Sequence, residues 1–215
     1  MKDKTLISFL EHNVFEYPST DTIINQYADE IEGIDRKGGA TIRRENLLHY
    51  VSSFKGRPEL LLLGEAPGPW GCRFSGIPFT GEGPLSRGEL PFAGKQSSTS
   101  ASPYSERSGT VFWELLAPYH PRFFVWNTIP FHPHLPGNYL SVRNPRWSEV
   151  KEYLPLLEEL IAILKPQRIA AIGRIAERAV TAIGQQCTYV RHPSYGGVKL
   201  FREGMERIFR PGCAS

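Results

Sequence analysis

The stretch LLLLGEAPG, at Leu60–Gly68, decides the fold of this chain. Four consecutive leucines are typical of a strand that is buried on both faces of a parallel sheet, and the Gly/Pro turn that follows carries one carboxylate, Glu65. A second turn, RHPSYGG at Arg191–Gly197, follows a short β-like run at Thr188–Val190. Because the carboxyl ends of parallel strands meet at one edge of a sheet, we expect both turns to lie at the edge where open α/β sheets bind ligands.

Strands and helices alternate along the rest of the chain. Alternation of this kind predicts a three-layer α/β/α sandwich with a four-stranded, mostly parallel sheet. Residues 1–35 are expected to be helical with a loop at Tyr17–Ser19. Pro155 is expected to kink its helix or delay its start. The predicted strands are 59–63, 122–126, 168–172 and 187–190, and the main predicted helices are 41–54, 108–119, 148–165, 174–183 and 198–209.

The length of the chain predicts a single domain with a full core. We expect this domain to span residues 1–215, with a long loop at about 68–109 that is dense in Gly, Pro and Ser. A loop of this length in a compact domain is either functional or disordered. Scattered aromatic residues favour a functional loop, but both alternatives stay open for the segment KQSSTSASPYSERSG at Lys95–Gly109.

Charge and cysteine content limit the class of protein. The net charge of +3 permits a polyanionic partner without requiring one. Cys72, Cys187 and Cys213 form no C-x-x-C pair, so a zinc or iron–sulfur site is not expected, and free thiols fit a cytoplasmic location. Glu11 interrupts the first apolar run, and we expect neither a signal peptide nor a membrane-spanning segment.

Five short segments, in this order, resemble the uracil-DNA glycosylase superfamily. They are GEAPG at Gly64–Gly68, GIPF at Gly76–Phe79, Asn127 at the end of the second strand, IGRIA at Ile172–Ala176 and HPS at His192–Ser194. Each segment is weak by itself, and their order at strand ends makes the resemblance specific. It implies a uracil-DNA glycosylase-like fold and a base-excision repair enzyme that hydrolyses the N-glycosidic bond of uracil in DNA, giving free uracil and an abasic site.

The chain departs from the family pattern in two places. The best-known members carry an aspartate two residues after the first glycine of the first motif, where this chain has Ala66. The usual water-activating carboxylate is therefore missing, which predicts a slower enzyme. GEAPG members often hold an iron–sulfur cluster through four cysteines, which this chain lacks. The resemblance thus implies a cluster-free branch that uses no metal and no other cofactor.

The resemblance and the chemistry of the reaction assign roles to the residues of the base pocket. Phe79 is expected to stack on the flipped base, Asn127 to read O4 and N3–H of uracil, and His192 to stabilise the anion that develops on O2. Glu65 is the first candidate for activating water, and Glu82 is the second. The turn residues expected to border the base are Gly64, Ala66, Pro67 and Gly68.

DNA containing uracil is the expected partner, bound by a monomer. Tyr195 or Val198 is expected to wedge into the gap left by the flipped base, and the Lys95–Gly109 segment to grip the DNA. The residues expected to contact the backbone are Ser194, Tyr195, Gly196, Gly197, Arg107 and Lys199, with Arg73, Arg87, Lys95 and Arg191 as further phosphate contacts.

Alternative functions stay open on the sequence. A catalytically weak or inactive module of the same fold would recognise damaged or abasic DNA, and Ala66 favours this alternative. A nucleoside hydrolase would act on free nucleosides, and a glycosylase of the same superfamily would act on another deaminated base, such as hypoxanthine or xanthine. His120, His132 and His134 stand among prolines, a pattern more typical of a rigid loop than of a metal site.

Overall fold

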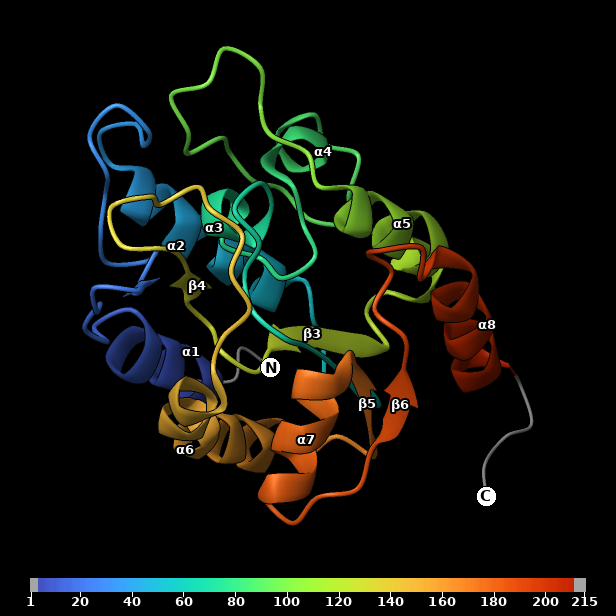
Figure 1. The fold of residues 1–215 in the computed structure, drawn as a ribbon. Coiled ribbons are helices and arrows are strands. Elements are labelled where there is room, and N and C mark those ends of the chain that lie inside the picture. Colours follow the sequence, from blue (N-terminus) through green and yellow to red (C-terminus); the bar gives the residue numbers. More distant parts are fainter. Residues whose placement is uncertain (1–3, 211–215) are drawn as a thin grey trace.

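A four-stranded parallel sheet forms the centre of the protein. The computed structural model describes residues 4–210, so Cys213 lies outside the described residues. The strand order is β3-β2-β5-β6, which confirms the predicted sheet and the α/β class. Figure 1 shows α1, α6 and α7 on one side of the sheet and α5 and α8 on the other. The strands are β2 (Leu60–Gly64), β3 (Phe123–Asn127), β5 (Arg168–Ile172) and β6 (Thr188–Val190).

The helices begin and end close to their predicted positions in the second half of the chain. The α6 helix begins at Trp147 although it contains Pro155, so the predicted delay of its start is wrong. Its first turn is closed by Glu149, which accepts a hydrogen bond from the N–H of Arg146 at 2.6 Å. The α-helices are α1 (Lys4–Phe9), α2 (Gly39–Ser52), α3 (Cys72–Ser75), α4 (Glu82–Ser86), α5 (Arg107–Leu116), α6 (Trp147–Leu164), α7 (Arg174–Ala182) and α8 (Val198–Phe209), with a short π-helix at Leu10–Val14 and a 3-10 helix at Ala117–Tyr119.

Residues 4–35 are less helical than predicted. Beyond the helical turns that end at Val14, the segment is irregular. It contributes the short strand β1 (Ile23–Ile24), which pairs antiparallel with β4 (His132–Pro133) in a separate two-stranded sheet. This pairing joins the amino-terminal segment to the loop that follows β3, a long-range contact that local sequence does not reveal.

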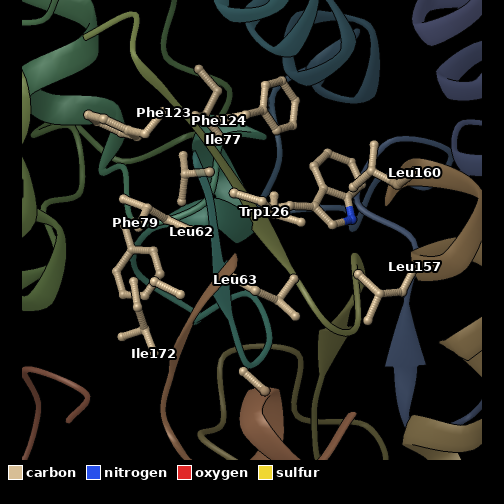
Figure 2. Close-up of a cluster of buried hydrophobic side chains, with 14 of the residues drawn as sticks. Leu62, Leu63, Ile77, Phe79, Phe123, Phe124, Trp126, Leu157, Leu160 and Ile172 are labelled. Carbon is tan, nitrogen blue, oxygen red and sulfur yellow. The ribbon is translucent and has the colours of Figure 1, made fainter. Parts of the chain in front are cut away.

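The core packs against both faces of β2. Every residue of this strand is buried, as its unbroken apolar run predicted, and successive side chains of a strand point to opposite faces. Figure 2 shows Leu63 and Trp126 on the side of Leu157 and Leu160 from α6, with Phe79 on the other side. The outer edge of β3 is covered by α2, because the N–H of Val125 donates to the hydroxyl of Tyr50 at 2.8 Å.

The long loop is ordered by buried polar contacts, and it contains α3 and α4. The Glu82 carboxylate is fully buried and accepts the backbone N–H groups of Ser97 and Ser98 at 3.0 and 3.2 Å. Since Ser97 and Ser98 are themselves buried, the prediction that the serines of this segment grip DNA is wrong for these two. Glu82 is committed to the same contacts, so its prediction as a water activator is also wrong.

Arg73 is buried as well, and it is therefore not a phosphate contact. Its guanidinium pairs with Asp35 at 2.7 Å, and Arg43 pairs with the other oxygen of the same carboxylate at 2.8 Å. All three side chains are fully buried. The guanidinium of Arg73 thus ties α3 to the amino-terminal part of the chain, where its charge stabilises a buried carboxylate.

Within residues 4–210, no helix is long and apolar enough to cross a membrane.

Candidate active site

The register of the sheet brings the predicted motifs to one edge. Gly64 and Asn127 are paired residues at the carboxyl ends of β2 and β3, and the HPS turn follows β6 at the same edge. A small cavity of about 20 Å³ lies between them. It is lined by Glu65, Ala66, Gly68, Cys72, Phe79, Glu106, Asn127 and His192.

The small cavity opens into a wider groove of about 440 Å³. Glu65, Ala66, Gly68, Glu106 and His192 line both spaces, so they form the mouth through which the groove enters the cavity. The far walls of the groove are formed by residues that include Trp70, His132, Arg143, Arg174, Arg191, Ser194 and Tyr195.

Phe79 forms a flat wall of the cavity. Its ring stacks on Phe112 of α5, with centroids 4.8 Å apart and an interplanar angle of 12°. The centroid of the His192 ring lies 5.5 Å from the Phe79 centroid. The backbone of Phe79 has a positive φ of 52°, which is uncommon for a residue with a side chain. Packing behind the ring therefore holds Phe79 in place at the edge of the cavity.

Asn127 presents its amide to the same cavity and is almost completely buried. Its Nδ2 group lies 3.9 Å from Cys72 Sγ, within reach of a weak hydrogen bond. Its Oδ1 atom faces Gly64, where an added Cβ would lie only 2.5 Å from it. The glycine at the end of β2 is thus required because it leaves room for the amide.

His192 enters the cavity as a neutral ring. Its Nδ1 atom accepts the backbone N–H of Ser194 at 3.2 Å and lies 2.8 Å from the hydroxyl of the same residue. Since Nδ1 is an acceptor, the proton of the neutral ring is on Nε2. Burial, with a smaller contribution from the charge of Arg191, lowers the pKa of His192 to about 4.

Glu65 connects two of the motifs. Its Oε1 atom accepts the N–H of Ile175 at 3.0 Å, at the start of α7, where a carboxylate is favoured by the helix dipole. Its carboxylate packs against Gly173, where a Cβ would overlap with it. Burial raises the pKa of Glu65, and the backbone N–H groups of α7 oppose that effect. Glu65 therefore holds the GEAPG turn against the turn after β5.

The neighbouring turn residues are also anchored. The carbonyl of Pro67 lies 2.8 Å from Nδ1 of His132, a buried residue whose pKa burial lowers to about 4. His120 has different partners, because its Nε2 lies 2.9 Å from the hydroxyl of Ser53. Among residues 4–210, no group of three His, Cys, Asp or Glu side chains is placed to hold a metal ion.

Glu106 is a functional candidate that the sequence analysis missed. It precedes the first residue of α5, and its carboxylate packs against Gly68 and Gly71, where a Cβ on Gly71 would overlap it. Its Oε1 atom accepts the hydroxyl of Ser108. Burial raises the pKa of Glu106. A signal was present, since ERSG at 106–109 places one carboxylate before a helix, but nothing local indicates that it faces the GEAPG turn.

The turn after β6 presents Tyr195 to solvent. The side chain of Tyr195 is 88% exposed and its backbone has a positive φ of 50°, while Gly196 is also exposed. Gly197 is buried against the carbonyl of His192, where there is no room for a Cβ. Val198 packs against the core, so of the two predicted wedge residues the geometry favours Tyr195.

The predicted phosphate contacts fall into two groups. Arg191 lines the groove, and Arg107 and Lys199 are exposed. Arg87 and Lys95 are engaged in surface ion pairs with Glu89 and Glu45, at 2.6 and 3.1 Å. Neither Arg87 nor Lys95 lines the groove or the cavity.

The sequence of this site matches one protein family. A model of that family, described as the uracil DNA glycosylase superfamily, matches residues 51–204. The chain belongs to this superfamily. The matched segment contains every residue that lines the cavity, and it leaves out α1, β1 and most of α2. The predicted resemblance to the superfamily is therefore confirmed.

Two known proteins resemble the chain, one in sequence over half of its length and one in fold over almost all of it. A type-4 uracil-DNA glycosylase from Pyrobaculum aerophilum is 32% identical over 114 residues, which cover 50% of this chain and 54% of that protein. The match thus spans about half the length of this curated relative. The crystal structure of wild-type SMUG2 from Pedobacter heparinus has a TM-score of 0.65 at 13% identity and covers 97% of this chain and 96% of its own. The structural likeness shows a shared fold.

Proposed function

We propose that the protein is a uracil-DNA glycosylase, which hydrolyses the bond between uracil and deoxyribose in DNA and releases free uracil and an abasic site. One observation carries the proposal. Phe79, Asn127 and His192, which come from three separate parts of the chain, line the same small cavity at the sheet edge. They supply a stacking face, a side-chain amide and a neutral imidazole, the groups that recognition and release of uracil need.

The first step is extrusion of the base from the DNA stack, which costs a few kcal/mol. The ring of Phe79, supported by Phe112, offers a stacking surface in return, and base–aromatic stacking is worth about 1–3 kcal/mol.

The cavity encloses about 20 Å³, which is room for about one water molecule rather than for a ring. Admission of a base therefore requires the rim of the cavity to open.

Asn127 supplies the specificity for uracil. Its amide oxygen accepts N3–H of uracil while its amide nitrogen donates to O4. Cytosine presents the opposite pattern at this edge, with an acceptor at N3 and an amino donor at C4. The amide oxygen would then face an acceptor, and the amide nitrogen would face a donor. Because Asn127 is buried, such unmatched polar groups are costly.

His192 stabilises the leaving base. As the bond to the sugar breaks, negative charge accumulates on O2 of uracil, and the Nε2–H group of a neutral imidazole donates to it. The hydrogen bonds from Ser194 hold Nδ1 as an acceptor, which keeps the donor on Nε2. With a pKa of about 4, the ring keeps this neutral form at physiological pH.

The groove is the proposed path of the DNA. Arg191 and Ser194 lie on one wall, and the exposed side chain of Tyr195 stands beside them to fill the gap that the flipped nucleotide leaves. Arg107 and Lys199 add charge without sequence preference. A monomer supplies all of these groups, since each belongs to the same chain.

The experiment is a base-release assay on oligonucleotides that carry one uracil, in single strands and opposite adenine or guanine. With enzyme in excess, we expect strand cleavage after alkaline treatment, and we expect His192→Ala to slow it strongly. Oligonucleotides with hypoxanthine, xanthine or thymine test specificity. Tight DNA binding with no release of any base would contradict the proposal and favour a binding module of the same fold.

A further inference from the structure

We infer that Glu106 is the carboxylate that holds and deprotonates the attacking water, an inference that rests on the proposed function. The GEAPG turn carries a single carboxylate, Glu65, and Ala66 follows it. A group that activates water is therefore either Glu65 or a carboxylate that another part of the chain brings to the cavity. The three carboxylates to compare are those of Glu65, Glu82 and Glu106, and their surroundings differ.

Two of the three are committed to other contacts. Glu65 Oε1 accepts the N–H of Ile175 at the start of α7 and packs on Gly173. Glu82 is fully buried among the backbone N–H groups of Ser97, Ser98 and Tyr104, and it lines neither the cavity nor the groove. Each of these carboxylates orders a loop.

Glu65 and Glu106 both stand at the mouth of the base cavity, because each lines the cavity and the groove. They differ in their partners: Glu65 accepts a backbone N–H group of α7, whereas Glu106 packs on Gly68 and Gly71 and accepts a side-chain hydroxyl. The hydroxyl of Ser108 donates to Oε1, which leaves Oε2 facing the turn. With the base in the cavity and the phosphates in the groove, the sugar carbon that joins them lies at this mouth.

The step balances with the residues present. The bond from C1′ to N1 breaks, and its electron pair leaves on uracil, where the His192 N–H group stabilises it at O2. The water oxygen forms the new bond to C1′, and its proton passes to the Glu106 carboxylate. The uracil anion is then protonated, and Glu106 returns its proton to solvent, so the products are neutral uracil and an abasic site.

The electrostatic surroundings support this role. Burial raises the pKa of Glu106, which makes its carboxylate a better base than an exposed one. Ser108 donates a hydrogen bond to the carboxylate. The other titratable or charged groups around it are Cys72, Glu65 and His192, which line the same cavity, and His132, Arg143, Arg174 and Arg191, which line the same groove.

The test compares Glu106→Gln with Glu114→Gln by single-turnover release of uracil. Glu114 lies on α5, the helix that Glu106 precedes, and it is exposed and pairs with Arg202 at 3.2 Å. We expect Glu106→Gln to lower the rate by about 100-fold while its melting temperature and DNA affinity stay those of the wild type. Glu114→Gln is expected to keep the wild-type rate. Formate is expected to restore part of the activity of Glu106→Ala by supplying a carboxylate.

The pH profile separates a catalytic from a structural role. The wild-type rate is expected to rise as a carboxyl group deprotonates, and this rise should be absent in Glu106→Gln but present in Glu65→Gln. A Glu106→Gln variant that releases uracil at the wild-type rate, or one that is slow but keeps the rise, overturns the inference. A Glu106→Gln variant that releases uracil at the wild-type rate and also releases thymine would overturn it too. That result would show that Glu106 contacts the base and selects it. If the wild-type protein releases no base, the proposed function itself fails.

Discussion

Gly64 and Asn127 are register partners at the ends of two adjacent parallel strands, and the amide of Asn127 occupies the space that a side chain at Gly64 would fill. An added Cβ would lie 2.5 Å from Asn127 Oδ1 and 2.6 Å from Cε2 of Phe79. The positions of the Asn127 amide and of the Phe79 ring thus both depend on the absence of a side chain at Gly64.

Gly64→Ala is therefore expected to damage recognition more than folding. Displacement of both pocket walls should lower uracil release by at least about tenfold, while overpacking costs about 1–3 kcal/mol of stability. Single-turnover kinetics and thermal unfolding measure the two effects. Gly56→Ala is the control, because nothing lies within 4 Å of a Cβ there. A Gly64→Ala protein with wild-type activity would contradict the tight packing around the amide.

Asp35→Asn is expected to destabilise the protein by about 3–5 kcal/mol. The substitution leaves Arg43 and Arg73 charged and buried without their carboxylate, which is costlier than the loss of an exposed pair. Urea unfolding measures the change. The exposed ion pair of Arg87 with Glu89 supplies the comparison, and Glu89→Gln should have no measurable effect. Equal stabilities of the two variants would show that the buried network contributes little.

The stability of the protein is expected to fall between pH 6.5 and about 4 in a way that depends on His192. Its pKa is about 4 in the folded protein against 6.5 for the free side chain. Within this window the unfolded chain binds more protons, so acid favours unfolding. The contribution is fully present above pH 6.5 and is worth about 2–3 kcal/mol.

Urea unfolding across this pH range measures the effect. His192→Gln should show a shallower fall in the free energy of unfolding than the wild type. His49→Gln removes an exposed histidine on α2 and should leave the slope unchanged. Parallel curves for wild type and His192→Gln would show that the ring titrates normally.

Tyr195→Ala is expected to slow uracil release from duplex DNA about tenfold and to affect single strands much less. Only in a duplex can the flipped base return to the stack and pair again with the opposite base, so only there must a side chain fill the gap. The readout is the ratio of single-strand to duplex rates. Leu200→Ala, which removes another exposed apolar side chain, is the control. An equal loss on both substrates would assign Tyr195 to general DNA binding.

The strands and the residues at their ends were readable from the sequence because their signals are local. The leucine run of β2 is apolar at every position. GEAPG and HPS mark the ends of β2 and β6, because glycine and proline favour turns over strands. Once the sheet is parallel, the ends of its strands must share an edge, so the closeness of Asn127 and His192 to the first motif followed from topology.

The tertiary structure decided which charged groups are free to act. Glu82, Arg73 and Glu106 look alike in the sequence as charged residues of one long Gly/Pro/Ser-rich region, yet two are buried in pairing networks and the third stands at the mouth of the cavity. Their partners lie up to tens of residues away, and no local pattern encodes such pairing. The sequence by itself determined the sheet and the identity of its edge, because burial and turn chemistry are local. Long-range packing decided which carboxylates are enclosed among hydrogen-bond donors, as Glu82 is, and which line the cavity, as Glu65 and Glu106 do.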